Sequence, residues 1–209
     1  MSATYRLDRD AGRLCDAAGR AFDPYSRRWS VGAVGGGGEA IDARTAVAWL
    51  QRQSGVPLRI PVGVIGPREA SKAQLAAAEA MGAGLARMGL AVVCGGRHGV
   101  MEAVCRGAAA HGGLTVGLLP DADPALANPH VGVVLATGIG EARNALIARA
   151  AFCLVAIGDS FGTLSEVAFG RQFGKLVVGL EGAANVDGVV HVGDVEAALD
   201  AVAALVLAE

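Results

Sequence analysis

Short apolar runs rich in β-branched residues recur along the chain from residue 60 onward. They occupy residues 62–65, 91–94, 114–119, 131–135, 153–157 and 176–180, and a weaker run lies at 189–192. The runs are apolar throughout instead of alternating between apolar and polar residues, which is typical of strands buried on both faces of a parallel sheet. We therefore predict a mostly parallel sheet over this part of the chain.

Segments with helical periodicity separate most of these runs. In the first segment, apolar side chains repeat every three or four residues at Leu75, Ala78, Met81, Leu85 and Met88. Ser71 is placed to cap this helix, and Gly89 is placed to end it. Further helices are predicted at residues 100–111, 142–151, 164–173 and 195–207. The alternation of strand and helix predicts an α/β fold with a doubly wound, Rossmann-like sheet.

Residues 1–57 follow a different pattern. Residues 13–16 and 20–23 flank an Ala-Ala-Gly turn and could pair as a short hairpin, and residues 43–52 have the pattern of a short helix. The glycine run at residues 35–38 is interpreted as a linker, because a phosphate loop needs a strand directly before it and a helix directly after it. We predict a small N-terminal appendage over residues 1–57 and a Rossmann-like domain over residues 58–209.

The composition excludes several classes of protein. Hydrophobic residues make up 53% of the chain and charged residues 18%, which excludes disordered and fibrous proteins. We find no apolar run of the ~18–20 residues that a membrane span needs and no secretory signal, and we expect a cytoplasmic protein. The formal net charge of −2 comes without a basic stripe, so no nucleic-acid partner is expected. The cysteines and histidines lack metal-ligand spacing, so no metal site is expected.

The candidate chemistry lies between strands and the helices that follow them, because ligands of an open parallel sheet bind beyond the carboxyl ends of the strands. The first such turn contains Gly95, Gly96, Arg97, Gly99 and Met101. Its free N–H groups and the positive end of the next helix favour an anion, and Arg97 adds positive charge. The alternative is that the glycines only make a tight turn. We favour anion binding, since a strand and a helix are both in register.

The second turn contains Gly158, Asp159, Ser160, Gly162 and Thr163. The hydroxyls and amides of Ser160, Gly162 and Thr163 are suited to a phosphate, whereas Asp159 would repel it unless a cation compensates the charge. Glu166 has two interpretations. It completes a Thr163-x-x-Glu166 capping box, or its carboxylate accepts a proton or holds a ribose hydroxyl. This segment alone favours the capping box.

The third turn leads into the helix that begins with Ala142, Arg143 and Asn144. A guanidinium in the first helical turn faces the mouth of the same cleft and could clamp a phosphate. The alternative for Arg143 is a solvated surface charge. These turns contain neither the G-x-G-x-x-G dinucleotide fingerprint nor a P-loop.

Taken together, the three turns resemble the LOG-like (Lonely Guy) superfamily over residues 60–209. It comprises cytokinin-activating phosphoribohydrolases, also labelled "possible lysine decarboxylase", and the related molybdenum-cofactor carrier proteins. Residues 95–104 are similar to the family's first glycine turn and residues 112–120 to the segment after it. Arg143-Asn144 and residues 158–166 stand at the separation of the LOG signature, a basic pair followed by P-G-G-x-G-T-x-x-E.

The resemblance implies roles for the matching residues. Arg143 and Glu166 match the catalytic pair of the LOG enzymes, and Gly162 and Thr163 match the turn that holds the nucleotide phosphate. The resemblance therefore favours a functional role for Glu166 over the capping box. This sequence has Asn144 where the enzymes have lysine, and Gly158-Asp159-Ser160 where they have P-G-G. These departures resemble the carrier branch more closely.

We therefore predict a carrier-like protein that anchors a nucleotide or a molybdopterin-type cofactor by its phosphate. The alternative is a phosphoribohydrolase that cleaves the N-glycosidic bond of nucleoside 5′-monophosphates. Lysine decarboxylation needs a Schiff-base lysine, and neither Lys72 nor Lys175 is expected at the cleft. The resemblance also implies a homo-oligomer, a dimer or tetramer, with apolar helices such as residues 142–151 as candidate interface.

Overall fold

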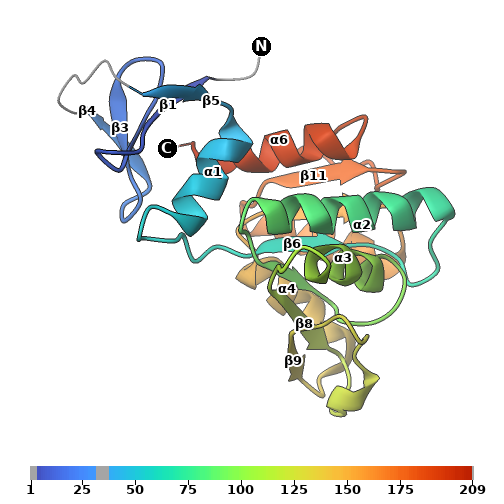
Figure 1. Ribbon diagram of the computed structural model, residues 1–209. Helices are drawn as coiled ribbons and strands as arrows, with labels where there is room; N and C mark the ends of the chain where they lie inside the picture. Colours follow the sequence, from blue (N-terminus) through green and yellow to red (C-terminus); the bar gives the residue numbers. More distant parts are fainter. Residues whose placement is uncertain (1–3, 32–37, 209) are drawn as a thin grey trace. The chain divides into compact units, whose positions relative to one another are not determined.

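The computed structural model describes residues 4–31 and 38–208 (Figure 1). Residues 60–199 form one compact unit, and residues 1–59 form another together with 200–209. The sequence-based division into residues 1–57 and 58–209 differs from this grouping at the C-terminal end. The reason is a set of local bonds within the smaller unit: Trp29 Nε1 donates to the carbonyl oxygen of Leu207 at 2.7 Å, and Arg44 pairs with Asp200.

The larger unit is built on a seven-stranded sheet in the order β12-β11-β10-β6-β7-β8-β9, and every neighbouring pair is parallel. Its strands are β6 (Val62–Ile65), β7 (Val92–Cys94), β8 (Thr115–Leu119), β9 (Val133–Ala136), β10 (Leu154–Ile157), β11 (Val177–Leu180) and β12 (Val189–His191). The predicted doubly wound, Rossmann-like fold is confirmed. The chain runs from β6 outward to β9 and then returns to β10 on the other side of β6, so the strand order reverses between β6 and β10.

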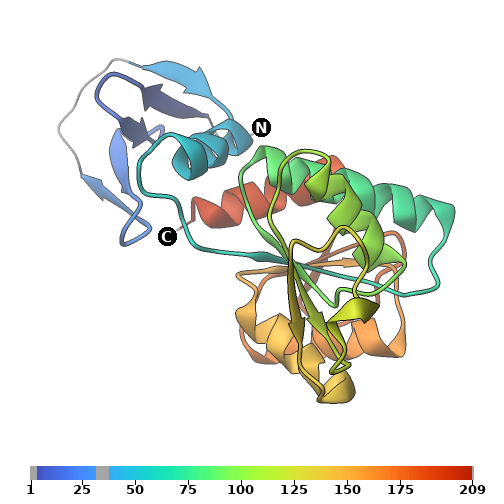
Figure 2. The ribbon, with the colours of Figure 1, turned by 60° about the horizontal axis from the view of Figure 1, so that its bottom comes forward.

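Helices cover both faces of this sheet (Figure 2). They are α2 (Lys72–Arg87), α3 (Val100–Ala109), α4 (Asn144–Ala150) and α5 (Phe161–Gln172), with the short 3-10 helices η1 (Pro124–Leu126) and η2 (Gly140–Arg143). A further helix, α6 (Val195–Val206), begins in this unit and ends in the smaller one. Helices α2 and α3 lie on one face, and α4 and α5 on the other. None of the described helices is both long and apolar enough to cross a membrane.

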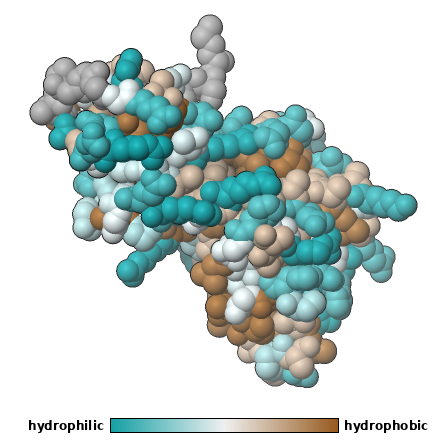
Figure 3. All heavy atoms as spheres, in the orientation of Figure 1, coloured by the Kyte–Doolittle hydropathy of each residue, from teal (hydrophilic) through white to brown (hydrophobic). Residues whose placement is uncertain are grey.

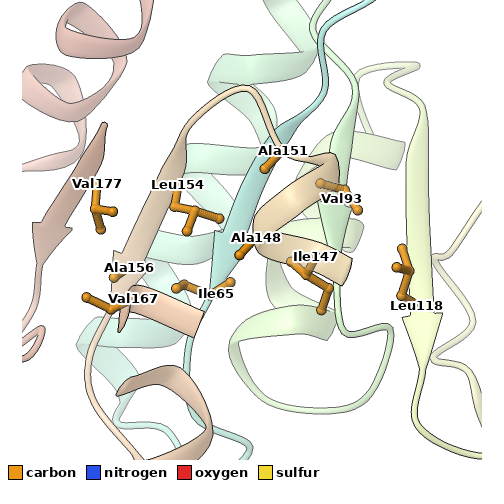
Figure 4. Close-up of a cluster of buried hydrophobic side chains, with 10 residues drawn as sticks. All are labelled: Ile65, Val93, Leu118, Ile147, Ala148, Ala151, Leu154, Ala156, Val167 and Val177. Carbon is orange, nitrogen blue, oxygen red and sulfur yellow. The ribbon is translucent and has the colours of Figure 1, made fainter. Parts of the chain in front are cut away.

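The hydrophobic core under α4 and α5 explains why these segments form helices (Figure 4). Ile147 and Ala148 of α4 and Val167 of α5 are fully or almost fully buried against strand residues such as Ile65 and Leu154. The apolar face of α4 is thus turned to its own sheet, although Leu146 stays exposed. Burial of these side chains fixes the two helices, and so fixes the turns that precede them.

The start and end of α2 follow the sequence signals. Ser71 Oγ accepts a hydrogen bond from the Gln74 N–H, and Gln74 Oε1 accepts one from the Ser71 N–H, which completes a capping box. Gly89 follows the helix with φ +75°, a conformation that glycine adopts without strain. The predicted cap and stop of this helix are therefore confirmed.

Strand β9 departs from the predicted burial on both faces. Val133 and Leu135 are 43% and 47% exposed, because β9 is the edge strand and pairs only with β8. Figure 3 shows apolar residues on the visible surface around this edge. The sequence run is as apolar as those of the central strands, so it gives no indication of edge position.

The smaller unit contains a five-stranded antiparallel sheet in the order β4-β3-β2-β1-β5, one complete helix and the C-terminal part of α6. Its elements are β1 (Tyr5–Asp8), β2 (Arg13–Cys15), β3 (Arg20–Asp23), β4 (Arg28–Val31), β5 (Glu39–Ile41) and α1 (Ala43–Arg52). The predicted hairpin exists as the antiparallel pair β2–β3, and α1 has the predicted bounds with Asp42 as its N-cap. Of the glycine run at residues 35–38, Gly35, Gly36 and Gly37 lie outside the described residues.

Candidate functional site

A cavity of about 740 Å³ lies at the carboxyl ends of β6 and β10, where the strand order reverses. Four segments supply its walls: the turn after β6, the start of α3, the segment from η2 into α4, and the turn from β10 into α5. The lining residues are Gly66, Pro67, Arg68, Glu69, Met101, Glu141, Arg143, Asn144, Asp159, Ser160, Phe161, Gly162, Thr163, Ser165 and Glu166. The volume lies within the roughly 300–1,000 Å³ of small-molecule sites.

A buried ion pair lies in the wall of this cavity. Arg143 Nη1 donates a hydrogen bond to Glu166 Oε1 at 3.1 Å, and the two side chains are only 4% and 8% exposed. Arg143 is the last residue of η2, and its guanidinium lies against Gly95, which has no side chain to displace it. Arg143 Nε is buried without a hydrogen-bond partner among the described residues. A positive charge is therefore held in the cavity wall with one donor unused.

The Glu166 carboxyl group is tuned by these surroundings. Burial raises the pKa of Glu166 from 4.5 to about 7, although the positive charge of Arg143 and its hydrogen bond pull the pKa in the opposite direction. The group is thus close to half protonated at neutral pH. Such a carboxyl can exchange a proton with a ligand, and in its neutral form it repels an anion less than an ordinary glutamate does.

The first turn of α5 supplies hydrogen-bond donors. Ser160 is its N-cap, and Ser160 Oγ accepts a hydrogen bond from the Thr163 N–H at 3.1 Å. The N–H groups of Phe161 and Gly162, in the same turn, make no hydrogen bond within the described chain. N–H groups at a helix N-terminus favour an anion.

This arrangement overturns the Thr163-x-x-Glu166 capping box. Ser160 caps the helix three residues before Thr163, and the Glu166 carboxylate pairs with Arg143 instead. The helix therefore begins at Phe161, not at residue 164. A cap at Thr163 would have required the chain to enter the helix one turn later.

Asn144 connects the start of α4 to α5. Its Nδ2 group donates to Ser165 Oγ at 2.8 Å, and Ser165 Oγ donates in turn to the Gly162 carbonyl oxygen at 2.7 Å. Asn144 Oδ1 is buried without a hydrogen-bond partner in the described parts of the chain. Asn144 thus supports the turn from β10 into α5 and leaves one acceptor unused.

The first glycine turn lies mostly outside the cavity lining. Of its predicted contacts only Met101 lines the cavity, while Gly95, Gly96, Arg97 and Gly99 do not. The Val100 N–H, at the start of α3, donates to the Pro67 carbonyl oxygen at 3.1 Å. Arg97 forms an ion pair with Asp121. This turn is packed against its neighbours, and its direct contribution is to make room for Arg143 at Gly95.

Most of the other predicted residues do meet in the cavity. Its lining includes Arg143, Asn144, Asp159, Ser160, Gly162, Thr163 and Glu166. Gly158 does not line it; with φ +71° it lies against the Gln74 side chain.

The turn after β6 also lines the cavity, although it was not among the turns predicted from the sequence. Gly66, Pro67, Arg68 and Glu69 form one wall, and Glu141, Phe161 and Ser165 complete the lining. The signal that would have identified this turn was present, because it joins the apolar run at 62–65 to the helix capped by Ser71. It contains only one glycine, so it does not stand out as a glycine-rich turn.

Comparisons with known proteins agree with this architecture. The family model of the SLOG cluster4 family matches residues 59–203. A protein of Archaeoglobus fulgidus is 35% identical over 128 residues, which cover 61% of this chain and 84% of the relative.

Two solved structures resemble the chain closely. One is the molybdenum cofactor binding protein of Rippkaea orientalis, with 30% identity and a TM-score of 0.67 over 71% of this chain and 99% of that one. The other is the molybdenum cofactor carrier protein of Chlamydomonas reinhardtii, with 33% identity and a TM-score of 0.67 over 72% and 100%. The predicted resemblance to the LOG-like superfamily is confirmed: the chain belongs to the SLOG cluster4 family.

Proposed function

We propose that this protein binds a small phosphorylated ligand in the cavity and carries it without turnover. The proposed ligand is a molybdopterin-type cofactor or a nucleotide. One observation carries the proposal: Arg143, with its buried guanidinium, lines the same cavity as Phe161 and Gly162, whose N–H groups make no hydrogen bond within the described chain. A positive charge next to free N–H donors is the arrangement that binds phosphate in proteins.

The Arg143 and Asn144 side chains both line the cavity, and each keeps one polar atom without a hydrogen-bond partner among the described residues. Arg143 Nε and Asn144 Oδ1 are buried without partners in the described structure, and such groups cost about 1–3 kcal/mol each when they stay unsatisfied. The structural neighbours from Rippkaea and Chlamydomonas, which bind or carry the molybdenum cofactor, favour a pterin over other ligands.

The acidic residues of the lining do not exclude an anion. Asp159 Oδ1 accepts a hydrogen bond from the Ser160 N–H at 2.8 Å, so part of its charge is already compensated. Glu166 carries less than a full charge at neutral pH because burial raises its pKa to about 7. The remaining carboxylates, Glu69 and Glu141, lie at the exposed rim.

A second candidate is the phosphoribohydrolase, and the raised pKa of Glu166 is the observation that favours it. In that reaction the C1′–N bond of a nucleoside monophosphate breaks, the base leaves with the electron pair and a proton, and water adds to C1′. Glu166 would stabilise the positive charge on the ribose or take the proton of the attacking water. We favour the carrier because Asp159 and Ser160 stand where the hydrolases have glycine.

We also propose that the protein is cytoplasmic and forms a homo-oligomer. The exposed apolar side chains of β9 favour an oligomer more than α4 does, because α4 turns its apolar face to its own sheet. Light scattering coupled to size-exclusion chromatography measures the number of subunits.

Native mass spectrometry of the protein purified from cells that make the cofactor tests the proposal. We expect a bound mass that matches a phosphorylated pterin or nucleotide. Arg143→Ala, purified in the same way, should lose that mass. Arg106→Ala should keep it, because Arg106 of α3 pairs with Glu79 of α2 and does not line the cavity. A bound compound without phosphate, or one retained equally by Arg143→Ala, would contradict the proposal.

A further inference from the structure

Glu141 lies between two arginines at the rim of the cavity. Glu141 Oε1 is 3.1 Å from Arg68 Nη2, and Glu141 Oε2 is 3.9 Å from Arg143 Nη2. Each oxygen of one carboxylate thus faces a different guanidinium. Two guanidinium groups around one oxyanion are a typical phosphate site, and here the oxyanion belongs to the protein itself.

The two arginines differ in how firmly they are held. The Arg143 side chain is 4% exposed, whereas those of Arg68 and Glu141 are 48% and 64% exposed. Exposed ion pairs contribute little, roughly 0.2–1 kcal/mol, because water competes for both charges. Glu141 can therefore leave this position at low cost, while the buried guanidinium stays.

The fold fixes the backbone of Arg68 close to the start of α3. The Pro67 carbonyl oxygen accepts a hydrogen bond from the Val100 N–H at 3.1 Å. The Arg68 carbonyl oxygen lies directly against Gly99, where a Cβ atom would collide with it. Gly99 and the turn after β6 are thus packed together, and Arg68 extends from a rigid support.

We propose that Arg68 and Arg143 form a two-arginine clamp for the phosphate of the ligand, and that Glu141 is an internal anion that competes for the clamp. The inference rests on the proposed function, since it concerns the same cavity. It also restricts the class of ligand. A phosphate monoester carries nearly two negative charges and displaces the single charge of Glu141, whereas a phosphate diester or a carboxylate carries only one. The clamp therefore selects ligands with a terminal phosphate monoester.

Titration calorimetry with adenosine 5′-monophosphate as the probe tests the competition. Glu141→Gln should bind the probe about two- to fivefold more tightly than the wild type, because the amide no longer competes for the arginines. Arg68→Ala should bind it about tenfold more weakly. When Arg68 is already replaced by alanine, Glu141→Gln should increase the affinity for the probe less than it does in the wild type.

Glu69→Gln is the matched control, because Glu69 lines the same cavity with the same charge and makes no ion pair among the described residues. An equal increase in affinity in Glu69→Gln and Glu141→Gln would overturn the clamp. It would mean that removal of any negative charge from the cavity strengthens binding. If the wild type binds the probe and Glu141→Gln binds it with the same affinity, the clamp is overturned but the proposed function is not. Binding by Glu141→Gln without measurable binding by the wild type would support the clamp. No binding of the probe by any variant would overturn the clamp, whereas the proposed function is tested separately by the mass that co-purifies with the protein.

Discussion

Gly95 and Arg143 are packed so closely that the absence of one side chain makes room for the other. A Cβ atom at Gly95 would lie 2.7 Å from Arg143 Nη2 and 2.9 Å from Arg143 Nη1, much closer than ordinary contact. The two residues come from different strand-to-helix turns. The first glycine turn therefore contributes to the cavity by allowing the guanidinium to lie in its wall.

Gly95→Ala should destabilise the protein and displace Arg143. Its backbone is not in the left-handed region, so the cost comes from overpacking, which is about 1–3 kcal/mol. Urea unfolding and calorimetry with adenosine 5′-monophosphate measure the two effects. The matched control is Gly193→Ala, whose new methyl group would meet no atom within 4 Å and should change stability by less than about 0.5 kcal/mol. Equal stability of the two variants would contradict the packing argument.

The buried carboxyl of Glu166 should make stability depend on pH. In the unfolded chain it loses its proton above about pH 4.5, whereas in the folded protein its pKa of about 7 keeps the proton bound. The stability that this group contributes is fully present below pH 4.5 and is lost as the pH rises through 7. Each pH unit between the two values lowers the free energy of unfolding by about 1.36 kcal/mol.

Glu166→Gln isolates this effect, because the amide does not titrate. The free energy of unfolding of the wild type minus that of Glu166→Gln should fall by about 2–3 kcal/mol from pH 5 to pH 7. Urea unfolding at several pH values measures this difference. A difference that stays constant over the range would mean that Glu166 has an ordinary pKa.

Arg143→Ala should weaken phosphate binding far more than removal of another arginine. A buried charge-assisted contact contributes roughly 1.5–3 kcal/mol, which corresponds to an affinity loss of about 10- to 100-fold. Arg149 is unsuitable as the control, because its guanidinium lies 3.6 Å from the centre of the Phe173 ring. Arg106→Ala, which breaks only a half-exposed ion pair with Glu79, should leave the affinity unchanged. If calorimetry gives both variants the same affinity, Arg143 does not bind the phosphate and has only a structural role.

The succession of strands and helices from residue 60 onward could be predicted from the sequence, with bounds correct to within a few residues. Buried parallel strands need apolar side chains on both faces, so runs such as 62–65 stand out from their surroundings. The exact start of α5 was not readable, because Ser160 and Thr163 are both good caps and only the path of the chain out of β10 selects Ser160.

The site could be predicted only in part, because contacts between residues far apart in the sequence depend on the path of the chain. Arg143 and Glu166 are 23 residues apart, and they meet because the crossover from β9 to β10 brings α4 beside α5. Periodicity gives no information about such a pairing, and the family resemblance supplied it. Arg68 and Glu141 could not be paired from the sequence, since they lie in different strand-to-helix turns, 73 residues apart.

The wild type should release no free base from adenosine 5′-monophosphate, and Glu166→Gln should change only its affinity. The reason is that Asp159 and Ser160 replace the glycines of the hydrolase signature, although Glu166 itself has a pKa suited to proton transfer. Chromatography of the reaction mixture detects the base. Release by the wild type that disappears in Glu166→Gln would assign the protein to the enzyme branch.

The most direct measurement of the central claim is a thermal shift with matched ligands. Nucleoside 5′-monophosphates or a phosphorylated pterin should raise the melting temperature, since a hundredfold excess over Kd stabilises the folded state by about 2.7 kcal/mol. The corresponding nucleosides and the dephosphorylated pterin should cause little or no shift, because they lack the phosphate that we propose is bound by Arg143 and the first turn of α5. Equal shifts from the phosphorylated and dephosphorylated compounds would contradict a phosphate site in this cavity.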